Sequence, residues 1–136
     1  MAANMTLMRT ASWLLAVGAV LLLLGSLAHA LLGWPPIRDA LERAGVADDL
    51  IGGLAVGWYF GSVAMAAFGV ILVLCWRQAR ARTSGWQGTA ACLSLAYVTF
   101  GISAFFMRSF NLFFLVAFVL PGFIIGSAAV FGWRKP

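Results

Sequence analysis

Four long apolar runs leave this chain few possible folds. They cover approximately residues 13–33, 50–76, 88–107 and 111–133. The hydrocarbon core of a bilayer is about 30 Å thick and is crossed by about 20 helical residues, so each run is long enough to span it. The runs do not alternate polar and apolar residues as the strands of a membrane barrel do. We therefore predict an all-α membrane protein, an antiparallel up-down four-helix transmembrane bundle.

The composition also favours lipid as the solvent. The 136-residue sequence is 63% hydrophobic and 10% charged, whereas a soluble domain is about half apolar and about a quarter charged. A soluble chain of this length could not bury so much apolar surface. The chain is therefore expected to form a single transmembrane domain over residues 1–136.

The basic residues predict the orientation in the membrane. Cytoplasmic segments of membrane proteins carry an excess of lysine and arginine. With a cytoplasmic N-terminus, six of the nine basic residues face the cytoplasm: Arg9, Arg77, Arg80, Arg82, Arg134 and Lys135. The three others lie outside with all four acids: Arg38, Arg43 and Arg108 with Asp39, Glu42, Asp48 and Asp49. We expect both termini in the cytoplasm of a bacterial inner (plasma) membrane, and tryptophans at span ends, such as Trp86, at the membrane interface. Basic residues at span ends favour topology control over nucleic-acid binding.

A cleavable signal peptide is the alternative for the first run. Arg9 precedes an apolar stretch that ends in Ala28-His29-Ala30, an A-x-A pattern. The apolar run is longer than a usual signal-peptide core and continues past this site, which favours a retained span. The other three spans keep their orientation under either alternative.

The first outer loop contains a predicted surface helix over residues 36–44. Prolines at its start and Gly45 at its end are typical helix boundaries. Its charges form opposite-sign pairs four residues apart, Arg38 with Glu42 and Asp39 with Arg43. We expect this short extracytoplasmic helix to lie over the mouth of the bundle.

Small residues predict where the spans meet, because in lipid they allow helix backbones to approach closely. The second span carries a doubled GxxxG pattern at Gly53, Gly57 and Gly61, and Leu72 is expected to face lipid. Pro121 is expected to kink the fourth span. The other glycines predicted at helix contacts are Gly18, Gly25, Gly101, Gly122 and Gly126. The pattern does not distinguish packing within one chain from packing between two copies.

Polar and aromatic residues in the outer half suggest a ligand pocket. His29 is the single histidine and lies inside a span, where ionisable residues usually face the bundle interior. It can be a neutral structural imidazole, the gate of a ligand cavity, part of a proton relay, or an axial ligand to a pigment or haem. A haem held by two histidines of one chain is excluded. The residues predicted to line the pocket with it are Trp58, Tyr59, Ser103, Arg108 and Asn111. In the sharpest form of this prediction, His29, Tyr59 and Arg108 share one cavity.

Catalysis has little support in the sequence. No carboxylate lies inside a span to provide acid–base chemistry, and no nucleophile, phosphate-loop or metal-cluster motif occurs. We therefore predict no catalytic residues, no metal and no required cofactor. The expected function is a non-enzymatic accessory subunit of a larger membrane complex, or a binder of a lipid-like molecule in the outer half. A small transporter or channel acting as an oligomer is the alternative.

Two short patterns resemble known families. The spacing Gly25-x-x-x-His29 resembles antenna helices in which the histidine ligates chlorophyll. The chain as a whole resembles DoxX-like and other uncharacterised bacterial tetraspan proteins, which pair a histidine late in the first span with aromatic residues opening the second, here Trp58-Tyr59-Phe60-Gly61-Ser62. That resemblance implies a four-helix fold and little about activity.

Overall fold

The computed structural model describes residues 2–133, and this part of the chain consists of helices and their connections. The elements are α1 (Ala2–Ala28), the π-helical turn η1 (His29–Gly33), α2 (Trp34–Arg43), α3 (Asp48–Arg80), α4 (Trp86–Met107), the π-helical turn η2 (Leu115–Val119) and α5 (Leu120–Trp133). Four helices are long and apolar enough to cross a membrane: Thr6–Arg43, Asp48–Arg80, Trp86–Met107 and Leu115–Trp133. The prediction of an all-helical chain with four helices suited to a membrane is therefore confirmed. Arg134 and Lys135 of the topology prediction lie outside the described residues.

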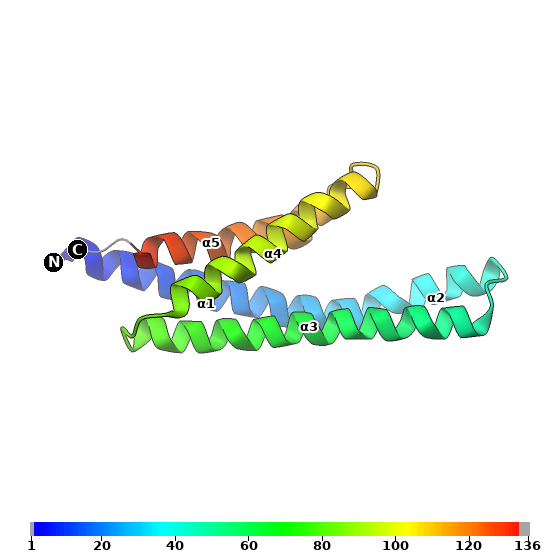
Figure 1. Cartoon of the computed structure of the whole chain (residues 1–136), viewed down its shortest axis with the longest axis horizontal. Helices are drawn as coiled ribbons and strands as arrows, with labels where there is room; N and C mark the ends of the chain where they lie inside the picture. Colours follow the sequence, from blue (N-terminus) through cyan, green and yellow to red (C-terminus); the bar gives the residue numbers. More distant parts are fainter. Residues whose placement is uncertain (1, 134–136) are drawn as a thin grey trace.

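The first helix is longer than its apolar run, because α1 continues through η1 into α2 without a break. The predicted separate surface helix over the bundle mouth is thus replaced by a straight extension, which lies beside the start of α3 (Figure 1). Pro35 and Pro36 do stand in the first turn of α2, at its second and third positions, as expected. They lack an N–H, so carbonyls one turn earlier lose their α-helical partners. The π turn absorbs this irregularity and the helix continues.

The elements form two helical hairpins, one made of α1, η1, α2 and α3 and the other of α4, η2 and α5 (Figure 1). The hairpins pack against each other at the end that holds both termini, which we call the closed end. They diverge toward the end that holds the 44–47 and 108–112 loops, which we call the open end (Figure 1). At 1.5 Å per residue, α3 is about 50 Å long and exceeds a hydrocarbon core of about 30 Å.

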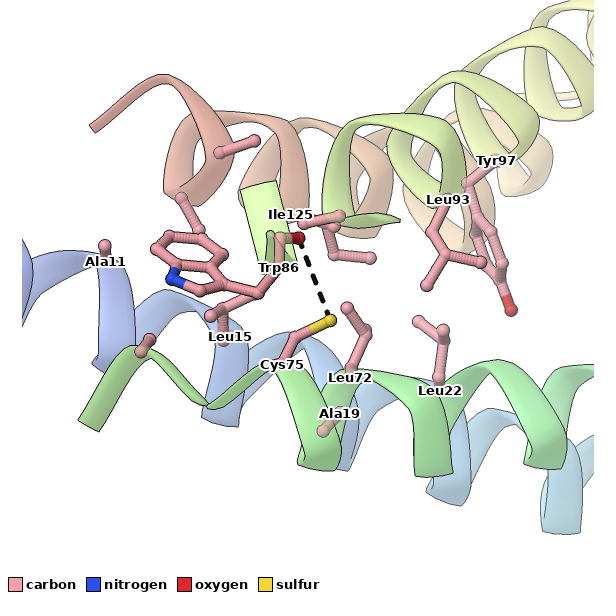
Figure 2. Packing of buried hydrophobic residues seen from close by; sticks show 14 residues of the cluster. Ala11, Leu15, Ala19, Leu22, Leu72, Cys75, Trp86, Leu93, Tyr97 and Ile125 are labelled. Atoms are coloured by element: carbon pink, nitrogen blue, oxygen red, sulfur yellow. Dashed lines mark hydrogen bonds between the residues drawn. The ribbon is translucent and has the colours of Figure 1, made fainter. Parts of the chain in front are cut away.

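The hydrophobic core occupies the closed end. Its fully buried side chains include Leu15, Leu72, Trp86 and Ile125, contributed by all four long helices. Figure 2 shows these residues facing one another, with the Cys75 Sγ 3.9 Å from the Trp86 carbonyl oxygen. Two expectations are corrected here. Trp86, expected at the lipid interface, points into the core with 1% of its surface exposed, and Leu72, expected to face lipid, is fully buried.

Glycines mark where backbones approach within each hairpin and at the closed end. A Cβ added to Gly69 on α3 would lie 2.7 Å from the Leu23 side chain and 3.3 Å from its backbone nitrogen on α1. A Cβ on Gly126 would lie 2.6 Å from the Ser94 Oγ of α4. Four other glycines of the prediction also lie against neighbouring helices: Gly18 against Ile125, Gly25 against Met65, Gly101 against Phe118, and Gly122 against Val98.

The three glycines of the GxxxG pattern in α3 are not closely packed against a neighbouring helix. A Cβ added to Gly53 or Gly57 would meet nothing within 4 Å, and one on Gly61 would meet only the His29 ring at 3.6 Å. Residues spaced 18 apart lie on the same face of an α-helix, since 18 residues make five turns. Leu54 and Leu72 are such a pair, and Leu54 is 46% exposed while Leu72 is fully buried. We call Gly53, Leu54 and Gly57 the open stretch of α3.

The predicted irregularity near Pro121 takes the form of the π turn η2, which ends two residues before it. Proline removes a backbone donor and crowds the preceding turn, and a widened turn relieves both effects. Pro121 itself is buried, and Gly122 beside it lies against the Ser94 carbonyl oxygen of α4, 3.2 Å from an added Cβ. The Ser94 hydroxyl donates to the Gly122 carbonyl at 2.8 Å, which joins the two helices of the second hairpin.

Candidate functional site

The polar group inside the first hairpin is built around the π turn that begins at His29. Gly33, at the end of this turn, faces the Trp58 indole so closely that a Cβ would lie 2.6 Å from Trp58 Cζ2. Glycine is therefore the residue that admits the indole between α1 and α3. Single π turns in long helices are frequent at functional sites. This π turn begins at His29, the single histidine of the chain.

His29 and Trp58 form a stacked pair. Their ring centroids are 4.0 Å apart and the planes are inclined by 6°. The indole Nε1–H donates to the His29 carbonyl oxygen at 2.8 Å, so ring and backbone contacts fix the same geometry. Trp34 lies at the outer side of the pair, with its ring centroid 6.1 Å from Trp58 and 6.4 Å from Tyr59. The histidine thus stands at the inner edge of an aromatic cluster.

Two buried serines lie next to His29: Ser62 contacts the imidazole, and Ser26 bonds to Ser62. The Ser62 Oγ lies 2.8 Å from His29 Nδ1 and 3.3 Å from the Trp58 carbonyl oxygen. The Ser26 hydroxyl donates to the Ser62 carbonyl oxygen at 2.8 Å. When the Ser62 hydroxyl donates to the Trp58 carbonyl, its oxygen accepts the Nδ1–H of His29. A neutral imidazole in this arrangement carries its proton on Nδ1 and a lone pair on Nε2.

The Nε2 atom of His29 has no hydrogen-bond partner among the described residues. A neutral imidazole oriented through its other nitrogen can accept a hydrogen bond from a hydroxyl or amine, or ligate a metal centre. The described residues contain no group of three or more histidine, cysteine or acidic side chains that could hold a metal ion. A metal or pigment at Nε2 would therefore take its remaining ligands from elsewhere. The arrangement fits a single directional contact to a ligand or a partner chain.

The structure brings together only part of the predicted pocket. His29, Trp58 and Tyr59 belong to the first hairpin, and Tyr59 is 46% exposed beside Trp34. Ser103 and Arg108 lie on the second hairpin, both exposed, at the end that diverges from the first (Figure 1). His29, Tyr59 and Arg108 are therefore not gathered in one cavity of this chain.

Arg108 and Asn111 have structural positions in the turn of the second hairpin. The Arg108 N–H donates to the Ala104 carbonyl at 2.9 Å and closes the end of α4. The Asn111 Oδ1 accepts the Phe113 N–H at 3.0 Å, which is the bond made by an N-terminal capping residue. Sequence reasoning placed both in a ligand site because both are polar and lie at similar depth.

Ser26 and Ser62 were missed as site residues because serine is common in membrane helices. The signal that could have found them is their position. Ser62 stands four residues after Trp58, and Ser26 stands three before His29, so each pair shares a helix face.

Comparison with known proteins adds no relative, since no protein-family model, curated protein or solved structure gives a significant match to the chain. A functional proposal rests on the geometry of the chain itself.

Proposed function

We propose that this chain is a non-enzymatic accessory subunit that receives a transmembrane helix of a partner protein between its two hairpins at the open end. The observation that supports this most strongly is the contrast along one face of α3. Leu72 on that face is fully buried against the second hairpin, whereas Leu54, five turns away, is 46% exposed. The same face thus continues from a packed core into a region that the described residues leave exposed.

The open stretch of α3 is suited to a helix. Gly53 and Gly57 lie one turn apart with nothing within 4 Å of an added Cβ. Small residues at this spacing let a second helix approach closely in lipid, where packing rather than hydrophobic burial drives association. A lipid chain, being flexible and thin, gains less from such a flat surface than a rigid helix does.

A buried polar atom at the root of the open end also supports a partner. The Tyr97 hydroxyl has no hydrogen-bond partner among the described residues, although the side chain is only 4% exposed. Tyr97 packs on Phe68 of α3 and Phe118 of η2, at the outer limit of the core. An unpaired buried hydroxyl is costly, so a rearrangement that lets a polar group of an incoming helix reach it is favoured.

The proposed orientation places both termini in the cytoplasm of a bacterial plasma membrane. All four acids lie between residues 39 and 49, at the open end, while Arg9, Arg77, Arg80 and Arg82 lie at the closed end. Under the positive-inside rule the closed end faces the cytoplasm. The four spans then run alternately up and down, as an antiparallel arrangement requires.

Site-specific photo-crosslinking in native membranes tests the accessory function. A photoreactive phenylalanine analogue at Gly57 should crosslink to a distinct membrane protein. The matched control is Val63, which is 66% exposed and lies on the opposite face of α3, nine residues or two and a half turns from Leu72. A crosslink to a second copy of the chain would instead favour the oligomeric transporter or channel. Equal, unspecific labelling from both positions would contradict a partner helix at the open stretch.

A second candidate, binding of a lipid-like molecule, is favoured by the unpaired Nε2 of His29 beside the aromatic cluster. Such a molecule would carry a hydroxyl or amine that donates to Nε2. Mass spectrometry of lipids retained by the purified protein tests it. His29→Gln keeps an acceptor and should retain the molecule, whereas His29→Leu should lose it. Identical lipid profiles would contradict this binding role.

A further inference from the structure

The closed end of the molecule contains a cavity that the outer-half prediction did not anticipate. Its volume is about 320 Å³, and it lies between the start of α1 and the end of α3. Its lining includes three arginines, two tryptophans and a serine: Arg9, Arg80, Arg82, Trp13, Trp76 and Ser12. A phosphate group with part of a glycerol unit is of a size that such a cavity admits.

The charges around this cavity have one sign. Arg9, Arg80 and Arg82 form no ion pair with any carboxylate of the described residues. The acids of the sequence begin at residue 39 and end at Asp49. Asp49 precedes Arg80 by 31 residues of α3, about 45 Å along the helix. Three guanidinium groups that share a cavity repel one another, and no carboxylate of the described residues balances them, so the cavity favours an anion.

The arginines are the right donors for phosphate. A guanidinium presents two parallel N–H groups to phosphate oxygens, which gives a stronger and more directional contact than an ammonium. The Arg80 guanidinium carbon lies 5.5 Å from the centroid of the Trp76 ring, a cation–π distance that orients the side chain at the cavity wall. A positioned arginine loses less freedom on binding an anion than a fully mobile one.

Arg82 occupies a backbone conformation that favours glycine. Arg82 follows Ala81, the C-cap residue of α3, and its φ is +57°. Its N–H donates to the Ala79 carbonyl at 3.2 Å. Helices commonly end in this left-handed conformation with glycine, which adopts it without strain. The chain instead places an arginine there, at a cost in stability. A guanidinium on the cavity wall is a reason to keep an arginine at this position.

The surroundings indicate a lipid rather than a soluble anion. Trp13, on the cavity wall, is 71% exposed on the lipid-facing surface of α1. Tryptophans concentrate at the headgroup level of membrane spans, and basic groups between spans on the cytoplasmic side attract anionic headgroups. We propose that this cavity binds the phosphate headgroup of an anionic phospholipid in the leaflet that the closed end faces.

Binding of defined lipids to the purified, delipidated full-length chain tests this proposal. Phosphatidylglycerol, zwitterionic phosphatidylcholine and inorganic phosphate are titrated separately in mild detergent, with native mass spectrometry and the midpoint of thermal unfolding as readouts. Phosphatidylglycerol should bind at least about tenfold more tightly than phosphatidylcholine, because only it leaves a net negative charge for the three arginines. Inorganic phosphate should bind weakly. Tight binding of free phosphate would identify a soluble anion and overturn the lipid assignment.

Matched charge variants separate this cavity from a general effect of charge. The triple change Arg9→Gln, Arg80→Gln and Arg82→Gln should weaken phosphatidylglycerol binding at least about tenfold. The control removes the same three charges at the open end, by Arg38→Gln, Arg43→Gln and Arg108→Gln, and should leave binding unchanged. Equal losses in both variants would overturn the proposal.

A single change covers the case in which the triple variant does not fold. Arg82→Gly relieves the left-handed backbone, so the fold should be retained or stabilised. Phosphatidylglycerol binding should nevertheless fall several-fold, because one of three donors is lost. Unchanged binding by a folded Arg82→Gly protein would show that Arg82 does not contact the lipid and would contradict the cavity as proposed.

Discussion

Replacing Leu72 with alanine is expected to destabilise the chain, while replacing Gly57 with leucine is expected to leave its stability nearly unchanged. Leu72 is fully buried, and its Cδ1 lies 3.5 Å from the position that a Cβ on Gly18 would take. It therefore fills space where α1 and α3 meet the Ile125 side chain of α5. Gly57 has nothing within 4 Å of an added Cβ, so the first atom of a larger side chain meets no neighbour among the described residues.

The magnitude follows from what a buried leucine contributes in lipid. In soluble cores, Leu→Ala costs about 3–5 kcal/mol, which includes transfer of the lost groups to water and a cavity term. Three lost carbon groups account for about 2.4 kcal/mol of transfer at about 0.8 kcal/mol each. That transfer term is absent when the separated helices face lipid, leaving packing and the cavity. We expect a loss of about 1–2 kcal/mol for Leu72→Ala.

Reversible unfolding of the purified protein by increasing sodium dodecyl sulfate measures this difference. The matched control is Leu74→Ala, since Leu74 lies on the same helix and is 49% exposed. The control should change the free energy of unfolding by less than about 0.5 kcal/mol. A larger loss for Gly57→Leu than for Leu72→Ala would mean that the second hairpin closes on α3, and would refute the open arrangement.

Three further changes probe local features. Gly69→Ala should destabilise the protein by about 1–3 kcal/mol, because the added Cβ meets α1. The control Gly52→Ala, whose Cβ has nothing within 4 Å, should be neutral or stabilise by up to about 1 kcal/mol in the same unfolding assay. Equal effects of the two changes would contradict the contact of Gly69 with α1. Asn111→Ala should cost about 1 kcal/mol by removing its capping bond and should speed amide exchange at the start of the last span; unchanged exchange would contradict the cap. Gly33→Ala should displace the Trp58 ring and shift its fluorine resonance in protein labelled with fluorotryptophan, because a Cβ would lie 2.6 Å from that ring; an unchanged spectrum would contradict the close approach.

The spans could be predicted from sequence, since hydrophobic length is set by the bilayer. Their helical ends could not, because hydropathy reports which residues lie in lipid and not where the helix stops. The first run was predicted to end at Gly33, yet the helix continues to Arg43. Pro35 and Pro36 were interpreted as a new helix start, and a π turn instead carries the first helix through.

Helix pairing was harder to predict than helix position. A glycine pattern states that close approach is possible and does not name the partner. Gly122 and Gly126 lie against α4, whereas at Gly53 and Gly57 of the more regular pattern an added Cβ meets none of the described residues within 4 Å. For the same reason, His29 and Arg108 were predicted to line one pocket because they lie at similar depth in the membrane, although they belong to different hairpins. The His29 and Trp58 contact could have been expected, because both were placed in the outer half of spans that follow each other.

Distances between the hairpins in lipid nanodiscs test the divergence at the open end most directly. Spin labels replace exposed residues on α3 and α4, in protein with Cys75 and Cys92 changed to alanine. One pair, Val70 with Leu95, lies near the contact of Phe68 with Tyr97, and the other, Phe60 with Phe106, lies about three turns farther toward the open end. Pulsed electron paramagnetic resonance should give a clearly longer distance for the Phe60 and Phe106 pair. Equal distances for the two pairs would show parallel, closed hairpins and would contradict an open end prepared for a partner helix.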